Sequence, residues 1–189
     1  MAYYEPPPLE VALTLGLGLT LLSPYYRHFA KDLNLQGNER VIDFGSGSGI
    51  CSRHIARQLK TGGQLHCVDI SHTWQKVIRK TLKRYEHIQY YCGRISELNL
   101  PDHSFDVIVI HFVLHDIPDS QRDVDFRNLA EKLNSGGRII FREPLTEGFT
   151  RQSALELTKK AGLEIKSIES KKIAMTEVID GCLISNNNE

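Results

Sequence analysis

A buried strand that leads into three closely spaced glycines constrains this chain more than any other feature. The strand candidate Arg40–Phe44 is apolar apart from its first residue and Asp43, and glycines follow at positions 45, 47 and 49. Glycines in such a turn let the backbone bend sharply and let a ligand approach without meeting a Cβ. A helical pattern of apolar residues begins directly afterwards, at Ile50. We therefore expect a strand, a ligand-binding turn and a helix in succession.

The spacing of these glycines indicates which kind of ligand the turn holds. Gly45, Gly47 and Gly49 form a G-x-G-x-G pattern, whereas dinucleotide-binding turns have G-x-G-x-x-G to hold a pyrophosphate at a helix N-terminus. Asp43 stands two positions before the first glycine. An acidic residue there favours a cofactor with a cationic ammonium and sulfonium over one with phosphates.

The next predicted strand, Gln64–Asp69, ends in a second acidic residue. Asp69 stands 24 residues after Gly45. A carboxylate at this position can accept hydrogen bonds from both hydroxyls of a ribose. Each motif taken alone is common in turns with a structural role only. Their occurrence in this order on one βαβ unit argues for an adenosine-bearing cofactor.

Strand-length apolar runs alternate with amphipathic helical stretches from Glu39 onward, which is typical of an α/β fold with a parallel sheet. Gly136-Gly137 is expected to be a turn before the fifth strand. The last two strands follow each other through a short link, which predicts an antiparallel end to the sheet. The expected strands after the second are Ile88–Cys92, Phe105–His111, Arg138–Phe141, Leu163–Ser170 and Glu177–Ser185; the later helices lie at Trp74–Leu82, Asp123–Leu133 and Ser153–Ala161.

Residues 1–34 are expected to be a separate N-terminal segment, followed by one domain over residues 35–189. Leucines alternate with mostly small residues from Leu9 to Leu21, a period of two that suits a strand, although Gly16 and Gly18 suit neither strand nor helix. Ser23 is the expected cap of a following helix, with Pro24 at its first position. The segment is rich in leucines and aromatic residues, which include Tyr3, Tyr4, Tyr25 and Tyr26. It is either an apolar lid over the acceptor or part of the core.

Composition excludes several classes of protein. The 189 residues suffice for one α/β domain, and 23 basic residues balance 23 acidic ones, so there is no strong nucleic-acid signal. The uncharged stretch from Val11 to Tyr26 is too short to span a bilayer. The four cysteines are far apart and lack the spacings of metal or redox motifs, so we expect no metal and a cytoplasmic protein with reduced thiols. The tail Asn186–Glu189 is expected to fray.

These motifs resemble those of the class I, Rossmann-like S-adenosylmethionine-dependent methyltransferases. Val41–Gly49 is similar to the first motif of that family. Further segments follow in family order: Cys67–Ser71, Gly93–Asp106, His111–Pro118 and Leu133–Arg138. The resemblance implies a three-layer sandwich with helices on both faces of a seven-stranded, mostly parallel sheet, ordered 3-2-1-4-5-7-6 with the last strand antiparallel. It also implies S-adenosylmethionine as cofactor and S-adenosylhomocysteine as product.

The resemblance assigns cofactor contacts residue by residue. One departure concerns position 94, where the family commonly has an aspartate that accepts a hydrogen bond from the adenine amine. Arg94 cannot accept that bond, so we expect the backbone at Ile95 and the side chain of Ile70 to hold adenine. The implied cofactor-binding residues are Asp43, Gly45, Ser46, Gly47, Gly49, Asp69, Ile70, Arg94, Ile95 and His111.

Catalysis requires a nucleophile held in line with an activated methyl group, and an acceptor that carries a proton also needs a general base. The candidate bases stand at the carboxyl ends of the fourth and fifth strands and are His111, His115, Asp116 and Glu143. We rank His115 first, His111 second and Glu143 third. The alternatives are a helix-start or packing role for His115, and a capping role or an ion pair with Arg142 for Glu143.

The acceptor itself is not specified by any motif, and a small molecule is the expected class. No substrate domain is inserted between Arg142 and Gln152. The acceptor is therefore covered by the N-terminal segment, by a second copy of the chain or another partner chain, or is not covered at all. Two other functions stay open. The chain could be a non-catalytic subunit of the same fold that activates a partner, or it could transfer an aminopropyl group, although the acidic cluster that a polyamine needs is not evident.

Overall fold

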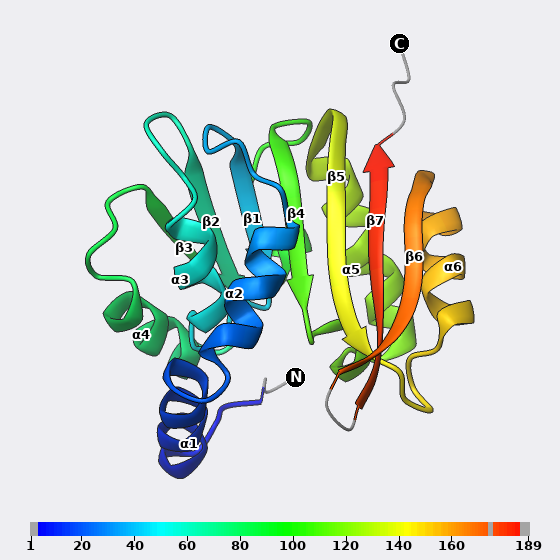
Figure 1. The fold of residues 1–189 in the computed structure, drawn as a ribbon. Coiled ribbons are helices and arrows are strands. Elements are labelled where there is room, and N and C mark those ends of the chain that lie inside the picture. The colour runs from blue at the N-terminus through cyan, green and yellow to red at the C-terminus, as the bar shows by residue number, and fades with distance from the viewer. Residues whose placement is uncertain (1–3, 174–175, 186–189) are drawn as a thin grey trace. The chain divides into compact units, whose positions relative to one another are not determined.

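The computed structural model describes residues 4–173 and 176–185, and its seven strands form one sheet (Figure 1). The strand order is β3-β2-β1-β4-β5-β7-β6. β7 runs antiparallel to both β5 and β6, while β1, β2 and β3 pair in parallel, as do β4 and β5. The expected order and antiparallel last strand are confirmed. Tyr3 and the tail Asn186–Glu189 lie outside the described residues.

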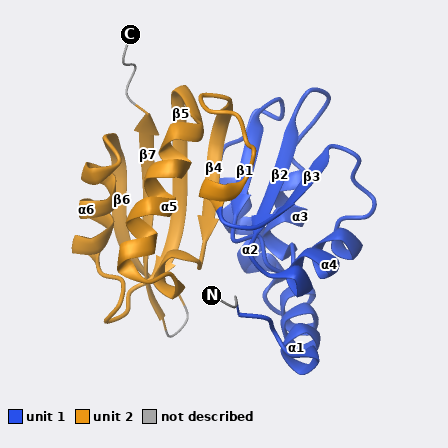
Figure 2. Ribbon diagram, turned by 180° about the vertical axis from the view of Figure 1, so that it is seen from behind, with its two compact units in different colours: residues 1–94 blue, residues 95–189 orange. Residues whose placement is uncertain are grey.

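Two compact units divide the chain, residues 1–94 and residues 95–189 (Figure 2). In the first unit, every strand has the bounds that the sequence predicts, because each is a short apolar run closed by turn residues. Its elements are α1 (Pro8–Leu19), α2 (Ser23–Asp32), β1 (Arg40–Phe44), α3 (Ile50–Ala56), β2 (Gln64–Asp69), α4 (His72–Thr81) and β3 (Ile88–Cys92).

The N-terminal leucine run is a helix, so the strand alternative was wrong. Pro8 occupies the first turn of α1, where a missing N–H costs nothing. A period of two places successive leucines 200° apart around a helix, so they fall on two opposite sides. Leu9, Leu13 and Leu17 form the exposed side, with 72%, 55% and 49% of their surface accessible. The pattern therefore lacked the single apolar stripe that would have indicated a helix.

The start of α2 differs by one residue from the prediction. Leu22 is the N-cap and Ser23 already belongs to the helix, with Pro24 behind it. The Ser23 hydroxyl lies 3.3 Å from Nε2 of His54 on α3 instead of capping α2. This contact helps to join α2 to α3, and α1 packs on both helices. The core beneath them includes the buried residues Phe29, Leu33, Val41, Ile55, Leu65 and Ile78.

The second unit contains the other four strands, with α5 and α6 on one face of them (Figure 2). Several bounds differ from the prediction: α6 begins two residues earlier, β6 ends three residues later and β7 begins one residue earlier, and the differences in α5 and β5 are larger. α5 begins at Asp119, directly after Pro118, rather than at Asp123, and β5 extends through Gly136-Gly137 because a register shift against β4 absorbs these glycines. The elements are η1 (Ile95–Glu97), β4 (Phe105–His111), η2 (Leu114–Asp116), α5 (Asp119–Lys132), β5 (Leu133–Pro144), α6 (Arg151–Lys160), β6 (Leu163–Ile173) and β7 (Thr176–Ser185).

A glycine in the centre of β7 fits against an aromatic ring of β5. Gly181 pairs with Phe141 across the two strands. A Cβ built on Gly181 would lie 2.1 Å from Cε1 of Phe141. The buried Phe141 ring thus occupies the space that a side chain at position 181 would need.

Candidate active site

The glycine turn after β1 has the backbone conformation that only glycine adopts without strain. Gly45, Gly47 and Gly49 have φ values of 70°, 49° and 79°. A Cβ on Gly49 would also come within 2.5 Å of the Ile78 side chain. The N–H groups of Gly45 and Ser46 both donate to the carbonyl of Val68 on β2. The turn is therefore fixed to the strand that ends in Asp69.

Asp69 lies where a ribose-binding carboxylate is expected. One carboxylate oxygen accepts the N–H of Gly47 and the other accepts the N–H of Ser71, both at 2.8 Å. These bonds leave further acceptor positions on the carboxylate for hydroxyl donors. Burial raises the pKa of Asp69, and the N–H groups of Ser71, Gly47 and Ile70 oppose that effect. The turn and the carboxylate therefore form one hydrogen-bonded unit.

Asp43, the other predicted acidic residue, is buried inside the first unit. Only 2% of its surface is exposed, and it accepts a hydrogen bond from the Ser52 hydroxyl of α3. Burial raises the pKa of Asp43 to about 7, and the nearby Asp69 adds to the increase. A cation bound beside these carboxylates would favour their charged forms, as a sulfonium or ammonium cofactor requires.

The residues that the resemblance assigns to adenine are Ile70, Arg94 and Ile95. Ile70 follows β2 and is 39% exposed, which leaves its side chain available for packing on a flat ring. Gly93 donates its N–H to the Asp69 carbonyl at 3.1 Å, which holds the segment before Arg94 next to the end of β2. Ile95 begins η1 of the second unit and is buried.

In the second unit, Glu143 and His115 form a hydrogen-bonded pair. Nδ1 of His115 lies 2.8 Å from Oε2 of Glu143. Because a carboxylate only accepts, Nδ1 carries the proton, and Nε2, the other ring nitrogen, lies 3.4 Å from Oδ1 of Asp116. The other Glu143 oxygen accepts the N–H groups of Val113 and Leu114 at 2.7 and 2.9 Å. Glu143, fully buried at the end of β5, thus fixes both the η2 turn and the histidine ring.

The charges around the two candidate histidines differ. The hydrogen bond to Glu143 raises the pKa of His115, whose side chain is 22% exposed. Burial lowers the pKa of His111 to about 3, and the Arg142 charge contributes. Between them, Phe112 has a φ of 59°, which is unusual for an aromatic residue and often marks a functional site. His115 is the stronger base of the two.

Among residues 4–173 and 176–185, no cluster of three or more histidine, cysteine or acidic side chains could hold a metal ion. Within the same residues, no single helix is long and apolar enough to cross a membrane. The consecutive helices α1 and α2 pass that test only when taken together, and they are bent by 68° where they meet.

The protein family described as "Methyltransferase domain" matches residues 42–141, a stretch that contains the glycine turn, Asp69, Arg94, Ile95, His111 and His115. The chain belongs to the class I S-adenosylmethionine-dependent methyltransferase family. This confirms the resemblance, and S-adenosylmethionine is the cofactor of the family.

Curated relatives of the chain are named for quinone methylation. Demethylmenaquinone methyltransferase of Tropheryma whipplei strain Twist is 32% identical over 117 residues, which make up 62% of this chain and 46% of that protein. The ubiquinone/menaquinone biosynthesis C-methyltransferase UbiE of Serratia proteamaculans is 27% identical over 156 residues, 77% of this chain and 61% of that protein. The chain thus spans about half the length of the first of these relatives.

Solved structures share the fold at low sequence identity. A SAM-dependent methyltransferase from Aquifex aeolicus has a TM-score of 0.78 and 12% identity, covering 96% of this chain and 100% of its own. The [4+2]-cyclase SpnF has a TM-score of 0.73 and 16% identity, covering 87% of this chain and 80% of its own. Because a cyclase and a methyltransferase share this fold, the fold alone does not determine the reaction.

Sequence reasoning placed Ser71 at the end of the segment Cys67–Ser71 but assigned no role to its side chain. Its hydroxyl caps α4 by accepting the N–H of Trp74 at 3.0 Å, and its N–H binds Asp69. A serine three residues before the first apolar position of a helix is a recognised N-cap signal that could have indicated this role.

Proposed function

We propose that the chain transfers a methyl group from S-adenosylmethionine to a small, apolar acceptor. The observation that carries this proposal is the unit formed by the glycine turn and Asp69, whose carboxylate retains acceptor capacity for ribose hydroxyls. When bound, the cofactor supplies an activated methyl group on a sulfonium. The protein then has to align the acceptor and remove its proton.

Support for an apolar acceptor comes from the N-terminal helices. A hollow of about 470 Å³ lies on α1 and α2, and its lining residues include Pro7, Leu9, Leu13, Leu17, Leu22 and Tyr26. Hollows of this size with an apolar lining suit small ligands. The relatives are named for methylation of demethylmenaquinone and for ubiquinone/menaquinone biosynthesis. We propose that residues 1–34 form the acceptor lid and that reduced quinones are the first acceptors to test.

Proton removal is assigned to His115. Glu143 receives the Nδ1 proton and so orients the ring, leaving Nε2 to accept a proton from a phenol-type acceptor. Glu143 itself is fully buried and already accepts two backbone N–H groups at short distance, which suits a positioning role better than that of a base. The low pKa of His111 suits a neutral, packed residue.

A direct test uses cofactor labelled on its methyl group and a set of reduced benzoquinones and naphthoquinones that lack one ring methyl. We expect label to appear in the quinone fraction and S-adenosylhomocysteine to form in equal amount. Tight cofactor binding without transfer to any acceptor would instead favour the non-catalytic subunit. Failure to bind either form of the cofactor would refute the proposal.

The lid can be tested on the exposed side of α1. Replacing both Leu13 and Leu17 with glutamine keeps good helix formers but removes the apolar lining. Each leucine contributes about 1.5 to 3 kcal/mol when fully buried by a ligand, and we expect partial burial. The KM for the acceptor should therefore rise about tenfold, with unchanged cofactor affinity.

Ala12 is exposed on α1 but does not line the hollow. Ala12→Gln is therefore the matched control for the leucine substitutions and should keep the wild-type KM. An unchanged KM in the double leucine variant would place the acceptor elsewhere.

A further inference from the structure

The N-terminal segment is tied to the first turn of α4 by Glu5. Its Oε1 accepts the N–H of His72 at 2.8 Å, and its Oε2 accepts the N–H of Thr73 at 2.9 Å and the hydroxyl of Ser71 at 2.8 Å. These partners lie 66 to 68 residues further along the chain. Hydrogen bonds donated by Thr73, Ser71 and His72 lower the pKa of Glu5 to about 2, so the carboxylate is charged at neutral pH.

Glu5 stabilises the first N–H groups of α4, a role that an acidic residue within the helix usually has. The first N–H groups of a helix lack partners within it, and an acidic side chain in the first turn commonly stabilises them. α4 has no acidic residue in its first turn. Glu5 and the Ser71 hydroxyl together satisfy the N–H groups of His72, Thr73 and Trp74.

The same contacts connect Glu5 with the ribose-binding carboxylate. Ser71 donates its N–H to Asp69 and its hydroxyl to Glu5, so one residue is held by both carboxylates. Glu5 is close enough to Asp69 to contribute to the raised pKa of that residue. The anchor point of the N-terminal segment is therefore next to the predicted ribose position.

The far end of α1 has a second contact with the cofactor-binding region. Gly18 is buried, and a Cβ built there would lie 2.0 Å from Cδ1 of Ile50. Ile50 is the first residue of α3 and directly follows the glycine turn. Between the two contacts, Pro6, Pro7 and Pro8 restrict the chain that connects Glu5 to α1. α1 is thus fixed at one end beside the loop after β2 and at the other beside the loop after β1.

We propose that Glu5 is a positioning residue that fastens α1 across the two loops that bind the cofactor, so that its release controls how fast the cofactor enters and leaves. This inference rests on the proposed role of Asp69. It predicts that the cofactor enters and leaves faster when the Glu5 carboxylate is lost, because the N-terminal segment then detaches from α4 more often. Association and dissociation should both accelerate, and equilibrium affinity should change less than either rate.

The experiment compares the full-length chain with Glu5→Gln and Glu5→Ala. Trp74 is the chain's single tryptophan and sits in the first turn of α4, so its fluorescence can report release of S-adenosylhomocysteine after rapid mixing with competitor. Amide hydrogen exchange at His72 and Thr73 reports the anchor itself. We expect dissociation to accelerate about three- to thirtyfold, the range that corresponds to loss of a helix cap, together with faster exchange at both amides.

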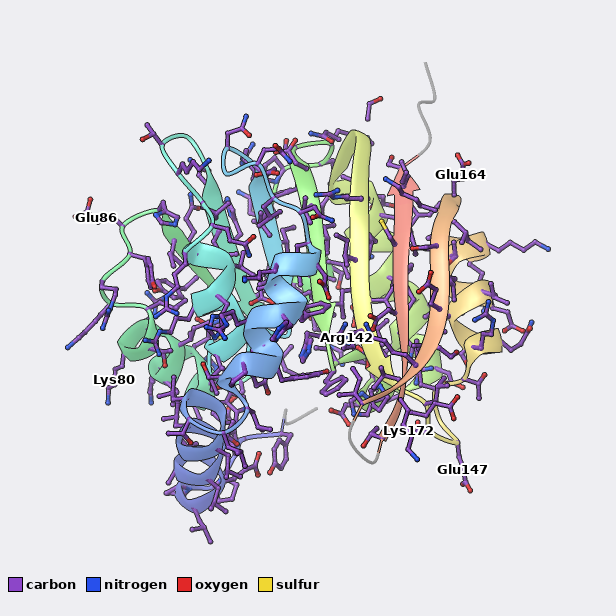
Figure 3. All side chains as sticks on the ribbon, viewed as in Figure 1. Lys80, Glu86, Arg142, Glu147, Glu164 and Lys172 are labelled. Carbon is purple, nitrogen blue, oxygen red and sulfur yellow. The ribbon has the colours of Figure 1, made fainter. Side chains whose placement is uncertain are left out.

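Glu86 is exposed, and its side chain points outward from the surface of the first unit (Figure 3). Glu86→Gln therefore controls for the loss of one negative charge. If exchange at His72 and Thr73 accelerated while the dissociation rate stayed at the wild-type value, Glu5 would be a helix cap only and the inference would be wrong. Unchanged amide exchange in both Glu5 variants would also overturn it. A wild-type chain that failed to bind S-adenosylhomocysteine would refute the function of Asp69 as well.

Discussion

Replacing His115 with alanine is expected to lower the rate of methyl transfer about 10²- to 10⁴-fold at neutral pH, the usual contribution of a general base. The variant should keep its cofactor affinity, because Asp69 and the glycine turn are unchanged. Its activity should recover partly at high pH, where a phenol-type acceptor ionises by itself. Steady-state rates between pH 6 and pH 10, measured alongside calorimetric titration with S-adenosylhomocysteine, would check both parts.

The pH dependence of kcat/KM provides the control for the assignment of His115 as the general base. His115 must be neutral to accept a proton, so kcat/KM should fall as the pH drops through its pKa, which Glu143 raises above the ordinary value. Glu143→Gln removes the charge that stabilises the imidazolium, so the acidic limb should move to lower pH even if the maximal rate also decreases. Activity and pH profile that persist in both variants would mean that alignment alone accounts for catalysis.

Loss of the Asp69 carboxylate should have the second-largest effect. Asp69→Asn preserves size and one acceptor oxygen but removes the charge, and Asp69→Ala removes the acceptor altogether. Hydrogen bonds to charged groups contribute about 1.5 to 3 kcal/mol, so the alanine variant should bind S-adenosylhomocysteine about 10- to 150-fold more weakly. The asparagine variant should fall between alanine and wild type.

Asp69 also holds the glycine turn and Ser71, so weaker binding could follow from a disordered turn. A cofactor analogue that lacks the ribose 2′-hydroxyl separates the two causes. If the carboxylate binds that hydroxyl, removing the carboxylate and the hydroxyl together should weaken the binding free energy by less than the sum of the two separate losses. Additive losses would indicate that Asp69 acts only through the turn.

The bounds of β1, β2, β3 and β4 could be predicted from the sequence because each strand is a short apolar run between turn residues. The N-terminal leucines could not be assigned, since their period of two divides them between opposite sides of α1. The start of α5 was missed by four residues although Pro118 before an acidic residue is a helix-start signal. The twelve-residue β5 was predicted too short because Gly136-Gly137 lies within the strand instead of ending it.

For the candidate site, residue types were predictable and their contacts were not. His115 and Glu143 were proposed as separate bases, and only the pairing of β4 with β5 brings their side chains within 2.8 Å. The contact of Glu5 with α4 had no sequence signal at all, because two of its three partners are backbone N–H groups far along the chain. Spacing rules detect neighbours on one helix or strand and miss contacts of this kind.

Because Phe141 fits against Gly181, substitutions at these two positions, which are 40 residues apart, depend on each other during evolution. A mutation from glycine at 181 could persist in a descendant only after the ring at 141 had been exchanged for a smaller side chain, since β5 and β7 cannot separate without breaking their ladder. The order of these two events is therefore fixed: the smaller residue at 141 must come first. Lineages that keep phenylalanine at 141 should all keep glycine at 181.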